Sequence, residues 1–187
     1  TEVRVSAATS APTFNFLSPD GRTALFRRSP TEAVLWRDGT TRTLQFSTEA
    51  VSAKVTRDGR TVISVDEAGV VVREDERGSV RLAQAAPGAS ALPSPDGRTV
   101  LVRYPLGFRV LDLDTGAERA ALVRAELGLN DTAAAWFLPD ESRVAVTGNP
   151  DADVGLRVWD PARGTLVTLA QSLYANRVLA VSPDRRW

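Results

Sequence analysis

A six-residue segment, Ser-Pro-Asp-Gly-Arg-Thr, occurs twice in this chain, at residues 18–23 and 94–99. A related segment lies between them at 56–61, and weaker copies follow at 138–143 and 182–186. The aspartates of the five copies are 38, 38, 44 and 44 residues apart. A fixed period near forty residues is typical of a repeat architecture, in which each repeat buries its apolar face against its neighbours. The chain is therefore predicted to be an array of similar units.

The residues around each copy predict short strands joined by tight turns. In the first unit an apolar segment at 13–17 precedes the turn and a second one at 23–28 follows it. Proline presets φ at the second turn position, and Asp-Gly closes the turn. Segment 33–37 then leads through Asp38-Gly39, a two-residue hairpin sequence, into the alternating segment 41–46. The same four-strand pattern predicts units at 13–46, 50–83, 89–123 and 132–170.

Four-stranded antiparallel units at this period predict an all-β chain with the architecture of a β-propeller, with about four complete blades. We treat residues 1–187 as a single, partial propeller domain. Residues 2–6 and 177–181 read as partial end strands, an outer and an inner one, of a further blade whose two middle strands are missing. Either the chain is a fragment of a longer propeller of roughly six to eight blades, or another copy or another protein supplies those strands. A self-contained four-bladed ring is the third alternative.

The predicted third strands of two units match closely. Residues 109–112 read Arg-Val-Leu-Asp and residues 157–160 read Arg-Val-Trp-Asp, with Gly116 and Gly164 at equivalent distances beyond them. Together with the Ser-Pro-Asp-Gly turns, these residues resemble the WD40 repeat family and its bacterial relatives, including the propellers of TolB-type proteins. Trp159 and the aspartate after it stand where that family places its namesake dipeptide. The Gly-His pair of the family is missing, so the resemblance is to the looser bacterial class.

Composition excludes several kinds of site. Positive and negative side chains balance at 23 each, without the basic excess typical of nucleic-acid binding. The chain has no cysteine and no histidine, so it cannot build a Ser-His-Asp triad or a thiolate or histidine zinc site by itself. No apolar run is long enough to span a membrane. We therefore expect no cofactor, no bound metal, no nucleic acid and no membrane insertion. Lys54 is the only lysine, a bias that suggests a GC-rich bacterial, for example actinobacterial, genome.

The candidate site residues fall into three groups. The aspartates of the repeated turns are interpreted as structural caps, because aspartate bonds backbone N–H groups in tight turns. They are Asp20, Asp58, Asp96, Asp140 and Asp184. Trp36 and Trp159 occupy equivalent strand positions and are expected to pack between blades. A dense charged patch is interpreted as solvated surface, with a partner contact as the alternative. Its residues are Glu67, Arg73, Glu74, Asp75, Glu76 and Arg77.

A longer connection between the third and fourth units is the best candidate for a partner-binding loop. Segment 122–129 has helical character, and insertions in repeat proteins gather on one face, often the binding face. The residues concerned are Glu126, Leu127, Leu129, Asn130 and Asp131. No catalytic residue is expected in this chain.

The resemblance to WD40 repeats implies a non-catalytic scaffold for protein–protein interaction, as a regulatory or sensor module of a larger bacterial protein. Its partner would be a protein, or another propeller segment that completes the ring. The alternatives are a propeller domain that gates substrate for a hydrolase or peptidase, and a periplasmic binding propeller. The compartment stays open: the cytoplasm is slightly favoured over the periplasm or the cell exterior.

Overall fold

The computed structural model describes residues 13–17, 21–46, 49–123, 134–138, 142–147 and 155–170. Within these residues the chain forms strands and turns, arranged as four separate four-stranded antiparallel sheets. Each sheet is built from four strands that are consecutive in sequence and lie side by side in chain order. We call the sheets blades 1 to 4. The prediction of an all-β chain with four-stranded antiparallel blades is confirmed.

The strand bounds are as follows. Blade 1 contains β1 (Thr13–Leu17), β2 (Thr23–Ser29), β3 (Glu32–Arg37) and β4 (Thr40–Gln45). Blade 2 contains β5 (Ala50–Val55), β6 (Val62–Asp66), β7 (Val70–Asp75) and β8 (Gly78–Gln84). Blade 3 contains β9 (Ser90–Pro93), β10 (Thr99–Tyr104), β11 (Gly107–Asp112) and β12 (Glu118–Val123). Blade 4 contains β13 (Ala134–Phe137), β14 (Val144–Thr147), β15 (Leu156–Asp160) and β16 (Thr165–Ala170). The predicted end strands 2–6 and 177–181 lie outside the described residues.

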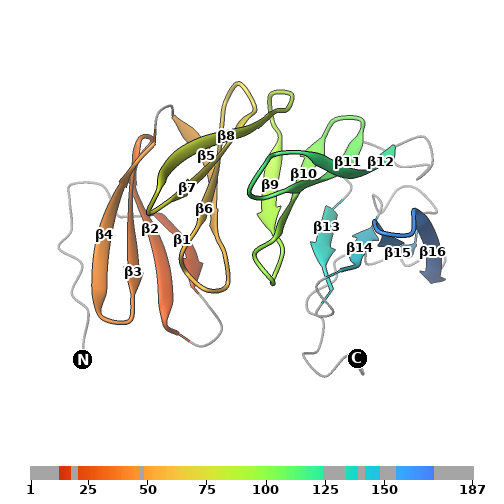
Figure 1. Ribbon diagram of the computed structural model, residues 1–187, viewed down its shortest axis with the longest axis horizontal. Coiled ribbons are helices and arrows are strands. Elements are labelled where there is room, and N and C mark those ends of the chain that lie inside the picture. The colour runs from red at the N-terminus through yellow and green to blue at the C-terminus, as the bar shows by residue number, and fades with distance from the viewer. Residues whose placement is uncertain are drawn as a thin grey trace.

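The blades follow one another in a row, from blade 1 at one end to blade 4 at the other (Figure 1). The first strands of neighbouring blades meet, since β5 contacts both β1 and β9. Within the described sheets, the first and the fourth strand of each blade are the two edges, each with one hydrogen-bonded neighbour. Each blade also has two broad faces. We call the face toward the preceding blade the first face, and the face toward the next blade the second face.

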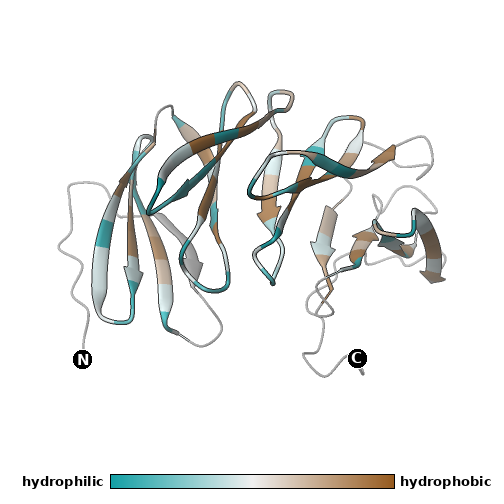
Figure 2. Ribbon diagram, in the orientation of Figure 1, coloured by the Kyte–Doolittle hydropathy of each residue, from teal (hydrophilic) through white to brown (hydrophobic). Residues whose placement is uncertain are grey.

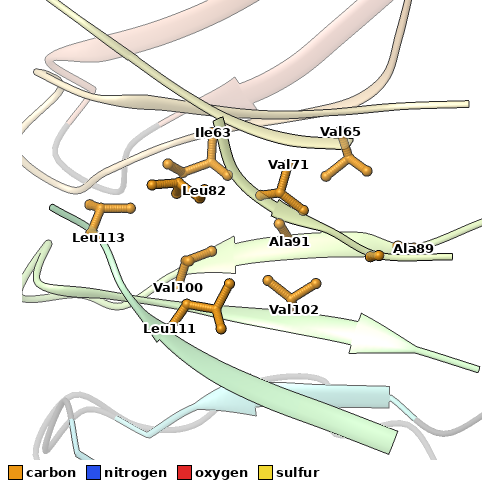
Figure 3. Packing of buried hydrophobic residues seen from close by; sticks show 11 residues of the cluster. Ile63, Val65, Val71, Leu82, Ala89, Ala91, Val100, Val102, Leu111 and Leu113 are labelled. Atoms are coloured by element: carbon orange, nitrogen blue, oxygen red, sulfur yellow. The ribbon is translucent and has the colours of Figure 1, made fainter. Parts of the chain in front are cut away.

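The hydrophobic core lies between blades, in three clusters that each join two neighbours. The cluster between blades 2 and 3 is the largest, and Figure 3 shows Ile63 and Val71 of blade 2 directed at Val100 and Leu111 of blade 3. Because successive side chains of a strand point to opposite faces, a fully buried strand serves two clusters at once. In β6, Val62 packs toward blade 1, whereas Ile63 packs toward blade 3. This explains why the middle strands are apolar along much of their length (Figure 2).

Candidate functional site

Equivalent strand positions carry very different side chains in the four blades. The register pairs Trp36 with Ala24 in blade 1 and Trp159 with Val144 in blade 4, so the two tryptophans occupy one position on the first face. Trp159 is only 1% exposed and packs among the residues of blades 3 and 4, whereas Trp36 is half-buried. Leu111 fills this position in blade 3 and Glu74 fills it in blade 2. Trp159 is more deeply buried than Trp36 because blade 3 covers the first face of blade 4.

The turn aspartates of blades 2 and 3 bond their own turns. Asp58 Oδ1 accepts from the Thr56 hydroxyl at 2.7 Å and from the backbone N–H of Arg60 at 3.0 Å. In blade 3, Asp96 Oδ1 accepts from the Ser94 hydroxyl at 2.6 Å and likewise from the N–H two residues on, at 3.0 Å. The hydroxyl-bearing residue is buried in both turns. Asp20, Asp140 and Asp184 lie outside the described residues.

A second set of aspartates caps the turns between third and fourth strands, which sequence reasoning did not single out. Asp112 Oδ1 accepts from the N–H of Asp114 at 3.0 Å and of Thr115 at 2.8 Å, and Arg119 donates to its other oxygen. These bonds hold the pKa of Asp112 at about 2, with the Arg119 bond as the largest cause. Asp160 Oδ1 accepts from two backbone N–H groups in the same way, at 3.0 and 3.1 Å. The aspartate at the last position of the third strand in blades 2, 3 and 4 was the available signal.

The charged segment 73–77 is solvated only in part, since Glu76 and Arg77 are exposed. Arg73 and Glu74 are both buried between blades. Arg73 donates to the carbonyl oxygen of Leu113 in blade 3 at 3.2 Å and to Asp114 Oδ1 at 3.1 Å. The Arg73 guanidinium also lies 3.3 Å from Asp75 Oδ2. One buried cation thus joins two blades through backbone and carboxylate oxygens.

Glu74 faces the other way, toward blade 1. It is 4% exposed, and in the described part of the structure its Oε1 has no hydrogen-bond partner. Burial raises its pKa, while the charge of Arg42 and a bond from Ser64 partly oppose the rise. Arg42 belongs to β4 and donates to the carbonyl oxygen of Asp75 at 2.7 Å. A carboxyl and a guanidinium therefore share the interface between blades 1 and 2.

Two exposed apolar side chains lie at the same end of blade 3. Leu106, in the hairpin between β10 and β11, is 73% exposed, and Val123, the last residue of β12, is 49% exposed. The register places Gly107 opposite Val123, which brings the hairpin beside the end of β12. At the base of this hairpin the Arg109 guanidinium lies 4.5 Å from the centre of the Tyr104 ring. We call Leu106 and Val123 the blade 3 end patch.

The candidate loop residues Glu126, Leu127, Leu129, Asn130 and Asp131 lie outside the described residues. The end patch immediately precedes this loop in sequence, because Val123 ends β12. Among the described residues no group of three or more histidine, cysteine, aspartate or glutamate side chains is placed to hold a metal ion. No helix in the described ranges is long and apolar enough to cross a membrane.

Comparison with solved structures shows the fold. A structure of a protein assigned as TolB from Agrobacterium tumefaciens matches 86% of this chain and 63% of its own length, with a TM-score of 0.61 and 14% sequence identity. A crystal structure of a Mitotic Checkpoint Complex contains a chain matched over 81% of this chain and 49% of its own length, with a TM-score of 0.62 and 14% identity. The chain thus spans less than two thirds of each. No family model matches the sequence, and no curated protein does.

Proposed function

We propose that this β-propeller chain is a non-catalytic scaffold for protein–protein interaction, within a regulatory or sensor module of a larger bacterial protein. The observation that carries the proposal is the blade 3 end patch. Burying a leucine side chain that water now surrounds is worth about 1.5–3 kcal/mol, so a partner that covered Leu106 would gain affinity from the contact. The residues predicted for the partner loop follow directly in sequence.

The rest of blade 3 makes the patch a rigid platform. The strands that carry it, β10, β11 and β12, are paired in one antiparallel sheet and contribute buried side chains to two interblade clusters. Binding residues are commonly held on loops that a rigid scaffold positions, because little entropy is then lost on association. The arrangement supports the display of a hairpin and a loop from a fixed blade. The similarity to a chain in a Mitotic Checkpoint Complex agrees with a role in assembly.

Site-specific cross-linking tests this proposal. The chain has no cysteine, so Leu106→Cys carries the only thiol and takes a photoreactive maleimide. The matched control is Arg60→Cys, an exposed position in the turn between β5 and β6. Because the strands are antiparallel, that turn lies at the opposite end of its blade from the hairpins of the Leu106 type.

We expect a discrete cross-linked protein from position 106 in a lysate of the source organism, absent from position 60. A second change, Val123→Glu in the Leu106→Cys chain, should reduce its yield by about tenfold, since a charge would be buried against the partner. Identical products from both positions, or none from either, would contradict the scaffold proposal. A peptidase as the cross-linked protein would favour the gating alternative.

A further inference from the structure

The interface between blades 1 and 2 differs from the other two described interfaces in one side chain. At the matched position on the first face, blade 3 carries Leu111 and blade 4 carries Trp159, whereas blade 2 carries Glu74. All three side chains are buried, and Glu74 is only 4% exposed. Among the described interfaces, the contact between blades 1 and 2 is therefore the one with an ionisable group at this position.

The surroundings of the Glu74 carboxyl group are unfavourable for a charge. Its Oε1 has no hydrogen-bond partner within the described ranges, and Val62 lies opposite Glu74 in the register. The cluster that joins the two blades is apolar and includes Leu35 and Leu44 of blade 1. A carboxylate that leaves water without a full set of hydrogen bonds is less stable than the neutral acid. Ionisation of Glu74 is therefore costly while the two blades are in contact.

Other charged groups compensate little of this cost. Those on the two faces that enclose the interface are Arg27, Arg37 and Arg42 of blade 1 and Asp66 and Arg81 of blade 2. Each of these except Arg42 interacts with a residue of its own blade. On the opposite face of blade 2, Arg73 pairs with Asp75. The charged side chains of the adjoining turns are exposed to water, and they are Arg22, Asp38, Arg57, Asp58, Arg60, Glu76 and Arg77.

Arg42 acts on Glu74 from β4 of blade 1. Its guanidinium donates to the backbone carbonyl oxygen of Asp75 at 2.7 Å. Burial raises the pKa of Glu74, and the charge of Arg42 and a hydrogen bond with Ser64 oppose only part of this rise. The proton is thus bound more tightly when the two blades are in contact than when water reaches the carboxyl group.

We propose that the interface between blades 1 and 2 is a joint controlled by one proton. It stays closed while the Glu74 carboxyl group is neutral, and it opens more often once that group is ionised. Opening returns the carboxylate to water and exposes part of the apolar cluster around it. The interface between blades 2 and 3 stays closed, because Leu111 has no charge to gain and Arg73 joins those blades at every pH of interest. This inference goes beyond the scaffold function and does not depend on it.

Thiol labelling measures the opening of each interface separately. The chain has no cysteine, so Ala33→Cys places a single thiol in the interface between blades 1 and 2, at a site that is 0% exposed. The matched reporter is Ala91→Cys, equally conservative, in the interface between blades 2 and 3. A dipyridyl disulfide reacts with thiols in acid as well as in neutral solution. Each rate is divided by the rate for the same variant unfolded in urea at the same pH, which removes the pH dependence of the reagent.

The normalised rate at position 33 should rise about tenfold per pH unit above 4.5, up to the raised pKa of Glu74, and then level off. Glu74→Gln, which has the same shape and never ionises, should abolish the rise. Glu76→Gln, at an exposed glutamate two residues away, should leave the rise unchanged. The rate at position 91 should stay constant over the same range.

Three results would overturn the joint. They are a rate at position 33 that does not change with pH, a rise that persists in Glu74→Gln, and an equal rise at positions 33 and 91. The third result would mean that the whole chain unfolds. Ala53→Cys, on the blade 2 side of the same cluster, gives a second reporter and should repeat the result at position 33, also where Ala33→Cys does not fold.

Discussion

Glu74 in blade 2 and Trp159 in blade 4 occupy the same position, each opposite the first residue of the second strand of its blade and each facing the preceding blade. Both side chains are buried. The tryptophan fills its interface with carbon, whereas the glutamate brings a carboxyl group whose Oε1 lacks a hydrogen-bond partner in the described structure. A single apolar substitution for Glu74, in the interface between blades 1 and 2, is therefore expected to give the largest gain in stability.

Glu74→Leu should stabilise the chain by about 1–2 kcal/mol, because replacing a buried charge by a well-packed apolar side chain removes its desolvation penalty. Leucine is already the residue at this position in blade 3. Urea unfolding of both proteins at neutral pH measures the difference. Glu76→Leu, at an exposed site two residues away, is the control and should change stability by less than about 0.5 kcal/mol. If Glu74→Leu lowered the free energy of unfolding, the interaction of the Glu74 carboxylate with Arg42 would be shown to stabilise the chain.

The raised pKa of Glu74 predicts a pH dependence of stability. The folded protein holds the proton more tightly than the unfolded chain, so stability falls as pH rises from the ordinary value of 4.5 through the raised folded pKa. Glu74→Gln should remove this part of the slope, and Arg42→Gln should extend it to higher pH because a positive charge is lost. Unfolding free energies measured at steps across this range test both. An unchanged slope in Glu74→Gln would contradict the prediction.

Trp159→Ala should cost about 3–5 kcal/mol of unfolding free energy, as expected for a large side chain removed from a close-packed interface. Trp36→Ala should cost about 1–2 kcal/mol, because its position is only half covered. Denaturant unfolding at low protein concentration measures both without a contribution from association. A loss below about 0.5 kcal/mol for Trp159→Ala would place this residue at the surface.

Gly116→Ala should destabilise more than Gly164→Ala, although the two glycines end the same turn in blades 3 and 4. Both have positive φ, +72° and +65°, so alanine is strained at either site by about 1–2 kcal/mol. A Cβ on Gly116 would also lie 2.6 Å from the carbonyl oxygen of Leu82, whereas one on Gly164 would meet nothing within 4 Å. Equal thermal shifts in the two variants would contradict this close approach of blade 3 to blade 2.

Asp112 should contribute to the acid stability of blade 3. Its folded pKa of about 2 lies below the ordinary 3.8, so its stabilising effect is complete above 3.8 and disappears as pH falls to about 2. Asp112→Asn should flatten the loss of stability in this range. Arg119→Gln should move the loss to higher pH, because it removes the largest cause of the shift. Acid titration followed by circular dichroism compares the three proteins, and superimposable curves would contradict the assignment.

Local turn chemistry made much of the fold predictable from the sequence. The segment 23–28, after the first Ser-Pro-Asp-Gly turn, was predicted as a strand, and β2 spans Thr23–Ser29. Such turns depend on a few adjacent residues, as the bonds to Asp96 show. The period of these turns then predicted the number of blades.

The contacts between blades were less predictable. Sequence placed Arg73 and Glu74 on the surface because five charged residues run together at 73–77. Burial is decided by the blade that covers each face, and alternation within one strand does not contain this information. Leu106 was missed for the same reason, since a leucine in a hairpin reads as core until its neighbours are known.

The contact of Arg42 with the carbonyl oxygen of Asp75, together with its charge near Glu74, matches blade 1 to blade 2. Repeats of similar sequence are prone to pack against the wrong neighbouring repeat while they fold. The counterpart of Arg42 is an aliphatic residue in every other blade described, for example Ala120 in blade 3 and Val167 in blade 4. A misplaced blade would leave the Glu74 carboxylate against a methyl group. The buried Glu74 carboxylate thus lowers the stability of the folded chain, but it also disfavours mispaired blades during folding.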